Sequence, residues 1–304
     1  MKTLKIANSN IIVPKGASGV YPTPDEMPLA HGIFVAVARR KGGKSVAISN
    51  LVRMMGYDRI WLLSPTASSN KAILDPLGIQ TEDIYEDMDD KDIINKVIAA
   101  MDKERDQYEL YIEQMKKYKE FLKILNDKNT LIPDTMLMQF YQNGMFVPPV
   151  SKYSNGKPKF AIIVDDAQNS KVFSGKTLSN LCIKHRHISQ LKEGNALGTS
   201  VFIMAQNYKC VSGGLPKPVR SNCCGWLLFK NFNEKEKAFV AEELAIDDIG
   251  KEEFVSMWDE VCDSQPHTFL FIDMEKKAHH QSSFRRNFSE FIVRPPPTKK
   301  EIQN

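Results

Sequence analysis

The stretch VAVARRKGGKSVAIS, residues Val35–Ser49, decides the fold. It ends in Gly43-Lys44-Ser45, the closing residues of the phosphate-binding pattern G-x-x-x-x-G-K-[ST], whereas Ala38 replaces the first glycine. An apolar run precedes it, and a segment with a helical apolar face follows it, built from Val46, Leu51, Val52 and Met55. Strand, loop and helix are the context in which this pattern binds nucleotide.

Each residue type in the loop can contribute to binding of a nucleotide phosphate or its Mg²⁺. Backbone N–H groups and a helix N-terminus hold phosphate oxygens. Lys44 would reach the β- and γ-phosphates of ATP, and Ser45 would place its hydroxyl on Mg²⁺. Ala38 is small, so its presence costs little. The alternative is an accidental lysine-rich turn. The nucleotide contacts expected are Arg40, Lys41, Gly42, Gly43, Lys44, Ser45 and Val46.

Six short apolar runs predict strands, separated by longer helical stretches. Nearly continuous apolar runs are typical of a parallel sheet that is covered by helices on both faces. The fold class predicted is therefore α/β. The runs are Ile33–Val37, Arg59–Leu63, Phe160–Val164, Ser200–Ala205, Gly225–Phe229 and Thr268–Ile272.

Two acids follow the third of these strands, in FAIIVDDAQNS. Asp165 would hold the hydration shell of Mg²⁺ beside Ser45, and Asp166 would polarise the attacking water. A helix N-cap is the alternative for such a pair. The upstream Gly-Gly-Lys-Ser favours the catalytic interpretation.

The next strand ends in Gln206, within TSVFIMAQNY. In a parallel sheet its end would lie beside Asp165, at the edge where ligands bind. Gln206 would then sense the γ-phosphate or orient the water. An ordinary loop glutamine is the alternative.

Two arginines are candidates for an arginine finger that acts on a neighbouring subunit. Arg186 lies in CIKHRHISQ, and Arg220 in LPKPVRSN. A solvated arginine at a helix end is the alternative for Arg186. His185, Arg186 and His187 also raise the possibility of zinc, but this short cluster has no cysteine or carboxylate at ligand spacing.

Between the second and third strands, Asp92–Leu125 predicts one long polar helix with a single apolar stripe. The stripe would pack on the sheet or on a hairpin partner, or else form a coiled coil with another subunit.

The composition indicates a globular protein: 304 residues, 42% hydrophobic and 26% charged. The net charge of +4 excludes a blanket nucleic-acid coat but permits a local basic surface. No apolar run is long enough for a membrane span, and the N-terminus predicts no secretion. Five cysteines without CxxC spacing favour reduced thiols in a cytosolic compartment.

Taken in order, the motifs resemble the poxvirus-type genome-packaging ATPases of large DNA viruses and virophages, a branch of the FtsK–HerA superfamily. The resemblance covers about residues 32–231 and departs from the pattern at Ala38 and in the added segment Gln190–Gly198. The motifs that carry it are ARRKGGKS, RIWLLSPT, IIVDDAQ, IKHRHIS, VFIMAQNY and LPKPVRSN ahead of CGWLLFKN.

The resemblance implies a RecA-like P-loop ATPase that forms a ring, usually of six subunits, and moves double-stranded DNA into a capsid through a portal vertex. It implies ATP and Mg²⁺ as ligands, backbone contacts to DNA without sequence preference, and a location in the host cytoplasm or viral factory, with virion association as an alternative. The expected organisation is an arm at 1–31, an ATPase domain at 32–293 with a helical insertion at about 91–150, and a disordered tail at 294–304. The lysines expected to face DNA are Lys152, Lys157, Lys159, Lys209 and Lys217.

Three other functions stay open at this point. The first is a FtsK–HerA-type translocase for DNA segregation or conjugation. The second is a nucleotide-binding virion assembly protein. The third is a small-molecule kinase, for which Arg285 and Arg286 are weak candidates to clamp phosphate from a lid.

Overall fold

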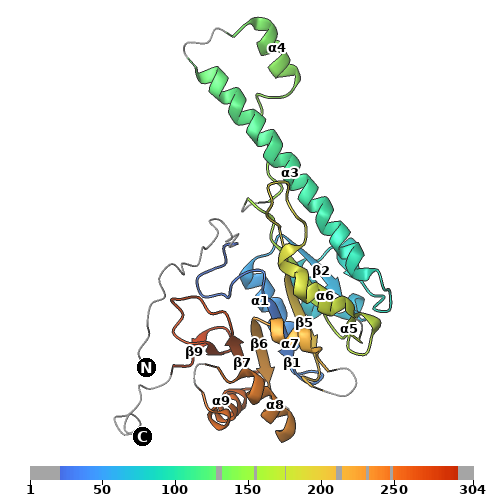
Figure 1. The fold of residues 1–304 in the computed structure, drawn as a ribbon, viewed down its shortest axis with the longest axis vertical. Coiled ribbons are helices and arrows are strands. Elements are labelled where there is room, and N and C mark those ends of the chain that lie inside the picture. Colours follow the sequence, from blue (N-terminus) through green and yellow to red (C-terminus); the bar gives the residue numbers. More distant parts are fainter. Residues whose placement is uncertain are drawn as a thin grey trace, which may run out of the picture.

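The computed structural model describes residues 21–127, 132–153, 156–174, 176–209, 214–230, 233–246 and 249–293. Most of the expected N-terminal arm, residues 1–20, and the expected tail, residues 294–304, lie outside the described residues, as does Cys210. Within those ranges the chain forms one nine-stranded sheet in the order β3-β2-β4-β5-β1-β6-β7-β8-β9 (Figure 1).

Five of the six predicted strands are found at the predicted residues. They are β1 (Ile33–Val37), β2 (Arg59–Leu63), β4 (Phe160–Val164), β5 (Ser200–Ala205) and β6 (Gly225–Phe229), and all five run parallel. The predicted α/β fold with a mostly parallel sheet is confirmed. The short strands β3 (Ile84–Tyr85), β8 (Phe284–Arg286) and β9 (Glu290–Phe291) were not expected.

The sixth predicted strand, Thr268–Ile272, is found one residue later as β7 (Phe269–Asp273) and is antiparallel to β6. Two helices, α8 (Glu234–Leu244) and α9 (Lys251–Ser264), connect β6 to β7. These two helices bring the chain back to the edge of the sheet at which β6 ends. The next strand, β7, therefore runs antiparallel to β6. As a result β7 begins at the carboxyl edge of the parallel strands, beside the phosphate-binding loop.

Strand side chains alternate between two cores, one on each face of the sheet. Phe34 and Ala36 of β1 face α1 (Lys44–Met55) and α2 (Lys71–Leu77), whereas Ile33 and Val35 face the other layer. That layer contains α8, α9 and four further helices: α3 (Ile93–Asn126), α5 (Lys171–Ser174), α6 (Lys176–Lys184) and α7 (Lys217–Asn222). Three short 3₁₀ helices complete the described elements: η1 (Ala67–Ser69), η2 (Thr81–Asp83) and η3 (His185–His187).

The long polar helix is α3 (Ile93–Asn126), one residue offset from the predicted bounds. Its N-terminal half packs on the sheet through Ile94, Val97 and Met101, and its C-terminal half projects from the body and carries α4 (Asp134–Gln142) at its end (Figure 1). The predicted stripe is therefore buried on the sheet only in its first half. None of the helices in the described ranges combines the length and the hydropathy needed to span a bilayer.

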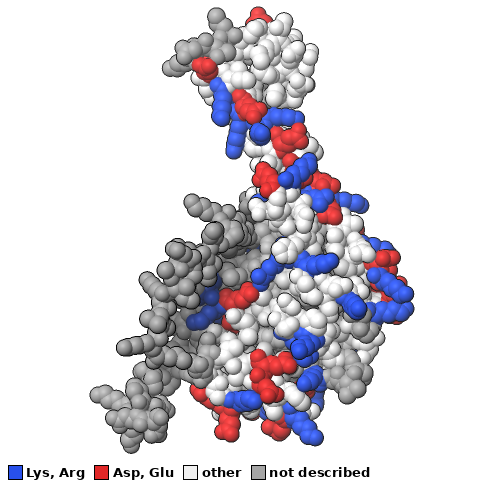
Figure 2. Space-filling model, in the orientation of Figure 1, with Lys and Arg blue, Asp and Glu red and all other residues white. Residues whose placement is uncertain are grey.

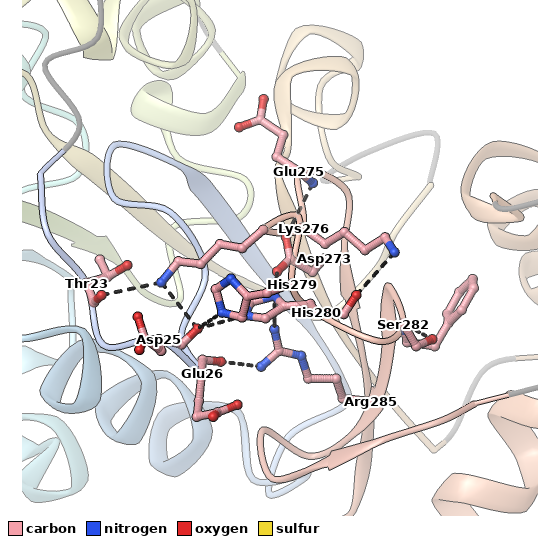
Figure 3. A network of polar contacts seen from close by, with 12 residues as sticks. Thr23, Asp25, Glu26, Asp273, Glu275, Lys276, His279, His280, Ser282 and Arg285 are labelled. Atoms are coloured by element: carbon pink, nitrogen blue, oxygen red, sulfur yellow. Dashed lines mark hydrogen bonds and ion pairs between the residues drawn. The ribbon is translucent and has the colours of Figure 1, made fainter.

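A buried cluster of polar side chains joins the entry segment, residues 23–26, to the antiparallel end of the sheet (Figure 3). Arg285 on β8 is 1% exposed; it donates to the carbonyl of Glu26 and lies 3.4 Å from the Asp273 carboxylate. His280 accepts from Arg285 at 3.0 Å and donates from Nε2 to the carbonyl of Asp25 at 2.7 Å. Burial raises the pKa of Asp273, and Arg285 opposes that shift. The guanidinium is thus the cation that keeps this cluster neutralised.

Removing that cation should destabilise the protein strongly. Arg285→Ala leaves Asp273 buried without its partner, which costs about 3–5 kcal/mol. The melting temperature should then fall on the order of 10 °C, as measured by scanning calorimetry. Arg286→Ala is the matched control, because that side chain is 38% exposed and pairs with Glu290 at the surface. Equal shifts in the two variants would contradict this assignment.

Candidate nucleotide site

The phosphate-binding loop connects β1 to α1 at the carboxyl edge of the sheet. Gly43 is the N-cap of α1 with φ of 100°, and no side chain caps the helix. The first N–H groups of α1 therefore remain available to an anion. Gly42 is required by close packing, because a Cβ there would lie 2.8 Å from the Cβ of Ala38.

Ala38 at the first loop position is accommodated by the core. Its side chain is 1% exposed and belongs to the core on the α1 face, and its N–H donates to the carbonyl of Ala205 at 3.1 Å. Ala38 does not line the pocket that borders the loop. This explains how the loop keeps its shape without the usual glycine.

A pocket of about 570 Å³ lies against the loop. One wall is the loop and the start of α1, including Lys41, Lys44, Ser45 and Val46. Val46 was expected on the buried face of α1, but it is 56% exposed and lines this pocket instead. The opposite wall comes from the start of β7 and from the turns beside the antiparallel strands, and it consists of His267, Phe269, Asn287 and Phe288.

Arg40 faces a different hollow. It lines an adjoining cavity of about 470 Å³ together with Lys41, Lys230 and residues that lead into β7. Of the seven nucleotide contacts expected from the sequence, Arg40 is thus the one whose side chain lies outside the pocket beside the loop.

Lys44 is buried and tied to its own loop. Its ammonium donates to the carbonyl oxygens of Ala38 at 2.6 Å and Arg39 at 3.1 Å. Burial lowers the pKa of Lys44, and the nearby Asp165 and Asp166 counteract that shift. The loop therefore holds a cation next to two acids, as the sequence predicts for the phosphate end of a nucleotide site.

Asp165 follows β4 and is 3% exposed. Burial and the neighbouring charge of Asp166 raise the pKa of Asp165 to about 6, against the opposing effect of Lys44. Asn70 donates to its Oδ2 at 2.8 Å. The carboxylate of Asp165 and the hydroxyl of Ser45 are hard oxygen ligands of the kind Mg²⁺ prefers, so the residues present fit this cation.

Asp166 is exposed and has φ of 48°, in the left-handed region. Backbone strain of this kind at a non-glycine residue is concentrated at functional sites. Gln206 follows β5, which lies between β4 and β1, and its side-chain amide is 3.4 Å from Asp166 Oδ1. Gln168 holds Gln206 through a hydrogen bond to its backbone N–H at 2.6 Å. The structure therefore brings Gln206 to the acid pair.

Asn70 and the aromatic wall are functional candidates that the sequence reasoning missed. Asn70 comes six residues after the polar end of β2, in a segment with no recognisable pattern. The residues of the wall lie at the ends of the antiparallel strands, and these ends are near the loop because β7 runs antiparallel to β6. Of these, only the Thr268–Ile272 run gave a sequence signal, and it indicated a strand but not its direction.

The two arginines lie elsewhere. Arg186 is in η3, beside the amino ends of β1 and β5, and pairs with Glu275 at 3.1 Å. About 17 Å of strand separates this edge from the loop. Arg220 is 12% exposed in its side chain, pairs with Glu243 at 3.0 Å and covers the ring of Tyr208. Neither arginine reaches the site of its own chain.

His185 and His187 lie in the same short helix as Arg186. Both ring nitrogens of His185 lie 2.8 Å from backbone carbonyl oxygens, those of Cys182 and His31. Among the described residues no three His, Cys, Asp or Glu side chains come together as metal ligands.

No family model matches the sequence, and no curated protein is similar enough in sequence to match it. Among solved structures, the chain is similar to the genome packaging NTPase B204 from Sulfolobus turreted icosahedral virus 2 in complex with sulfate, with 13% identity over 86% of this chain and 98% of that chain and a TM-score of 0.44. It is also similar to EssC (ATPases 2 and 3) from Geobacillus thermodenitrificans, with 16% identity over 80% of this chain and 38% of that chain and a TM-score of 0.39.

A third similar structure is the cytoplasmic domain of the Thermomonospora curvata type VII secretion ATPase EccC, with 10% identity over 96% of this chain and 31% of that chain and a TM-score of 0.39. Similarities as low as these do not establish a function, so the function proposed for this chain rests on its own residues.

The raised pKa of Asp165 predicts that hydrolysis depends on pH. A carboxyl group with a pKa of about 6 loses its charge as the pH falls through that value, so kcat/KM for ATP hydrolysis should decline below about pH 6. Asn70→Ala removes a hydrogen bond that lowers the pKa of Asp165. The acid limb should therefore move to higher pH, by about one unit for a hydrogen bond to a charged group. The pH dependence of kcat/KM measures both effects.

Ser68→Ala is the control for this experiment. Ser68 is an exposed residue two positions before Asn70, and it hydrogen-bonds Glu86 instead of Asp165. Its profile should match the wild type. An acid limb that is identical in wild type and Asn70→Ala would show that Asp165 does not govern it.

Proposed function

We propose that this chain hydrolyses ATP and uses the energy to move double-stranded DNA. The observation that carries the proposal is the convergence, at one edge of the sheet, of a buried lysine in a phosphate-binding loop, a buried acid with a raised pKa and an adjacent strained acid. Lys44 follows β1, and Asp165 and Asp166 follow β4. Strand β5 lies between β1 and β4, and Gln206 follows it.

The residues suggest how hydrolysis would proceed. Lys44 would exchange the carbonyl oxygens of Ala38 and Arg39 for the β- and γ-phosphate oxygens, while the N–H groups at the start of α1 hold the same phosphates. Asp166 would accept the proton of the attacking water, and Gln206, 3.4 Å away, would orient that water. Mg²⁺, held through Ser45 and Asp165, would supply neutralisation of the developing negative charge.

The motor proposed here would be a ring of several subunits with a cationic surface that contacts DNA. Because Arg186 and Arg220 lie outside the site of their own chain, either could contribute to hydrolysis only in a neighbouring subunit, which agrees with the proposed ring. Lys217 is exposed and suits contact with DNA phosphates, whereas the exposed Lys209 lies 4.0 Å over the ring of Phe239. Lys159 does not, because it is 6% exposed and donates to the carbonyl of Met55 at 2.7 Å. Lys152 pairs with the buried Glu104 at 2.8 Å.

The finer part of the proposal is genome packaging: a hexameric ring at a capsid or portal vertex, in the host cytoplasm or viral factory. It is supported by the ordered motifs described above. Translocation in segregation or conjugation, and a role in virion assembly, use the same site and remain alternatives. The kinase alternative loses one of its two candidate lid arginines, because Arg285 is buried in the sheet and paired with Asp273, while Arg286 pairs with Glu290 at the surface.

Hydrolysis should depend on DNA. Double-stranded DNA should raise the ATPase rate several-fold, without sequence preference, and the stimulation should weaken steeply with salt because phosphate contacts release counterions. Lys44→Ala should abolish hydrolysis with and without DNA. A coupled assay of ATP turnover across DNA and salt concentrations measures these effects.

Lys103→Ala is the control for the lysine variant, because it removes an exposed cation of α3 that lies outside the loop and the pocket. It should retain most of the turnover. Turnover that ignores DNA and instead requires a small phosphate acceptor would replace the motor with the kinase alternative.

Mixing experiments should identify the arginine that acts between subunits. Arg186→Ala subunits titrated into wild type should lower the rate more steeply than simple dilution, because each variant disables the site of its neighbour. Arg220→Ala is the comparison, since its ion pair to Glu243 and its place over Tyr208 indicate a structural role. A linear decline with Arg186→Ala would rule out its action in trans.

A further inference from the structure

The far end of the helical projection carries a concentrated apolar surface, here called the tip and defined as residues 132–150. Asp134 is its one charged residue. In the part of the chain that the structure describes, twelve large hydrophobic side chains are exposed, and half of them belong to the tip: Met136, Met138, Tyr141, Phe146, Val147 and Val150. Figure 2 shows the consequence, an end with very few charged side chains on a stalk that is dotted with charges of both signs.

The tip is held as a folded unit on a firm support. Phe121 of α3 is 2% exposed and lies edge-on to Phe140 and Phe146, with ring centroids 4.8 and 4.9 Å away. At the base of α3, the buried carboxylate of Glu104 pairs with Arg59 of β2 and with Lys152. The exposed apolar side chains therefore belong to a packed part of the chain. Their exposure to water is unfavourable in a monomer, and such surfaces commonly mark interaction sites.

A second apolar surface lies at the opposite end of the molecule. The groove between α8 and α9 has a volume of about 750 Å³ and an apolar floor of Ala238, Phe239, Ala241 and Val255. Phe239 is 43% exposed, with Lys209 4.0 Å over its ring. Two lysines and two glutamates at the rim balance in charge: Lys235, Lys251, Glu242 and Glu252. A neutral rim around an apolar floor suits an uncharged partner rather than a nucleic acid.

We propose that the tip of one subunit docks in the α8–α9 groove of a second copy of this chain. The projection carries the tip away from the groove of its own chain, since α4 and α8–α9 lie at opposite ends of the molecule (Figure 1). The tip carries one charged residue, Asp134, and the charges of the groove balance apart from Lys209, so a largely apolar contact brings at most one opposite charge from each side. A head-to-tail contact of this kind joins different surfaces of the two copies and builds rings when the rotation closes.

Sedimentation velocity of the full chain, without nucleotide or DNA, tests the contact separately from hydrolysis. The wild type should associate with rising concentration. A tip variant, Met138→Glu with Tyr141→Glu, and a groove variant, Phe239→Glu, should each associate at least tenfold more weakly, since each places a charge in an apolar contact. All three residues are exposed, so the folded state should survive, as circular dichroism would verify. Leu110→Glu on α3 and Ile183→Glu on α6 are matched controls at exposed apolar positions outside the tip and the groove, and they should behave as wild type.

Mixing the two defective variants gives the sharpest test. The groove variant retains an intact tip and the tip variant an intact groove, so the mixture should form a one-to-one dimer and nothing larger. A wild type that stays monomeric at all concentrations would overturn the proposal. So would a groove variant that associates as wild type while the tip variant does not, because the tips would then contact each other. Loss of flotation with neutral lipid vesicles in the tip variant, with unchanged self-association, would replace the protein partner with a membrane.

Discussion

The candidate site depends on the parallel pairing of β4, β5 and β1. Parallel strands end at the same edge of a sheet, so the residues that follow them meet there regardless of their distance in sequence. This constraint brings Lys44, Asp165 and Gln206 together although more than a hundred residues separate the first from the second. Every chemical role proposed for these side chains follows from that edge.

Opposite charges in a buried setting define the electrostatics of that edge. Lys44 is stabilised by two loop carbonyl oxygens and by the nearby acids, and Asp165 is stabilised by Lys44 and the amide of Asn70. Burial opposes the charged form of both side chains, and it moves the pKa of Asp165 to about 6. A group whose pKa lies close to neutrality responds strongly to added charge, so a bound cation and phosphate would change its protonation more than they would change that of an exposed acid.

The sequence allowed most of the fold and about half of the pocket to be predicted. Five strands were located to the residue because buried parallel strands are continuous apolar runs, and the loop and acid pair carry patterns with a chemical reason. The direction of β7 could not be predicted, since it depends on how α8 and α9 return the chain. The wall of His267, Asn287 and Phe288 was missed for the same reason. Burial of Lys159 and Arg285 was missed because their partners are backbone carbonyls and an acid distant in sequence.

The antiparallel strands β7 and β8 have a mechanical consequence. At one end they hold the entry segment, through Arg285 and His280 and the carbonyls of Asp25 and Glu26. At the other end they continue into Phe269, Asn287 and Phe288 beside the phosphate-binding loop. Strand β7 is hydrogen-bonded to both β6 and β8, so a displacement of β8 would be passed to β7 and to the rest of the sheet. A load applied where the chain enters the domain therefore reaches the nucleotide pocket without crossing a flexible joint.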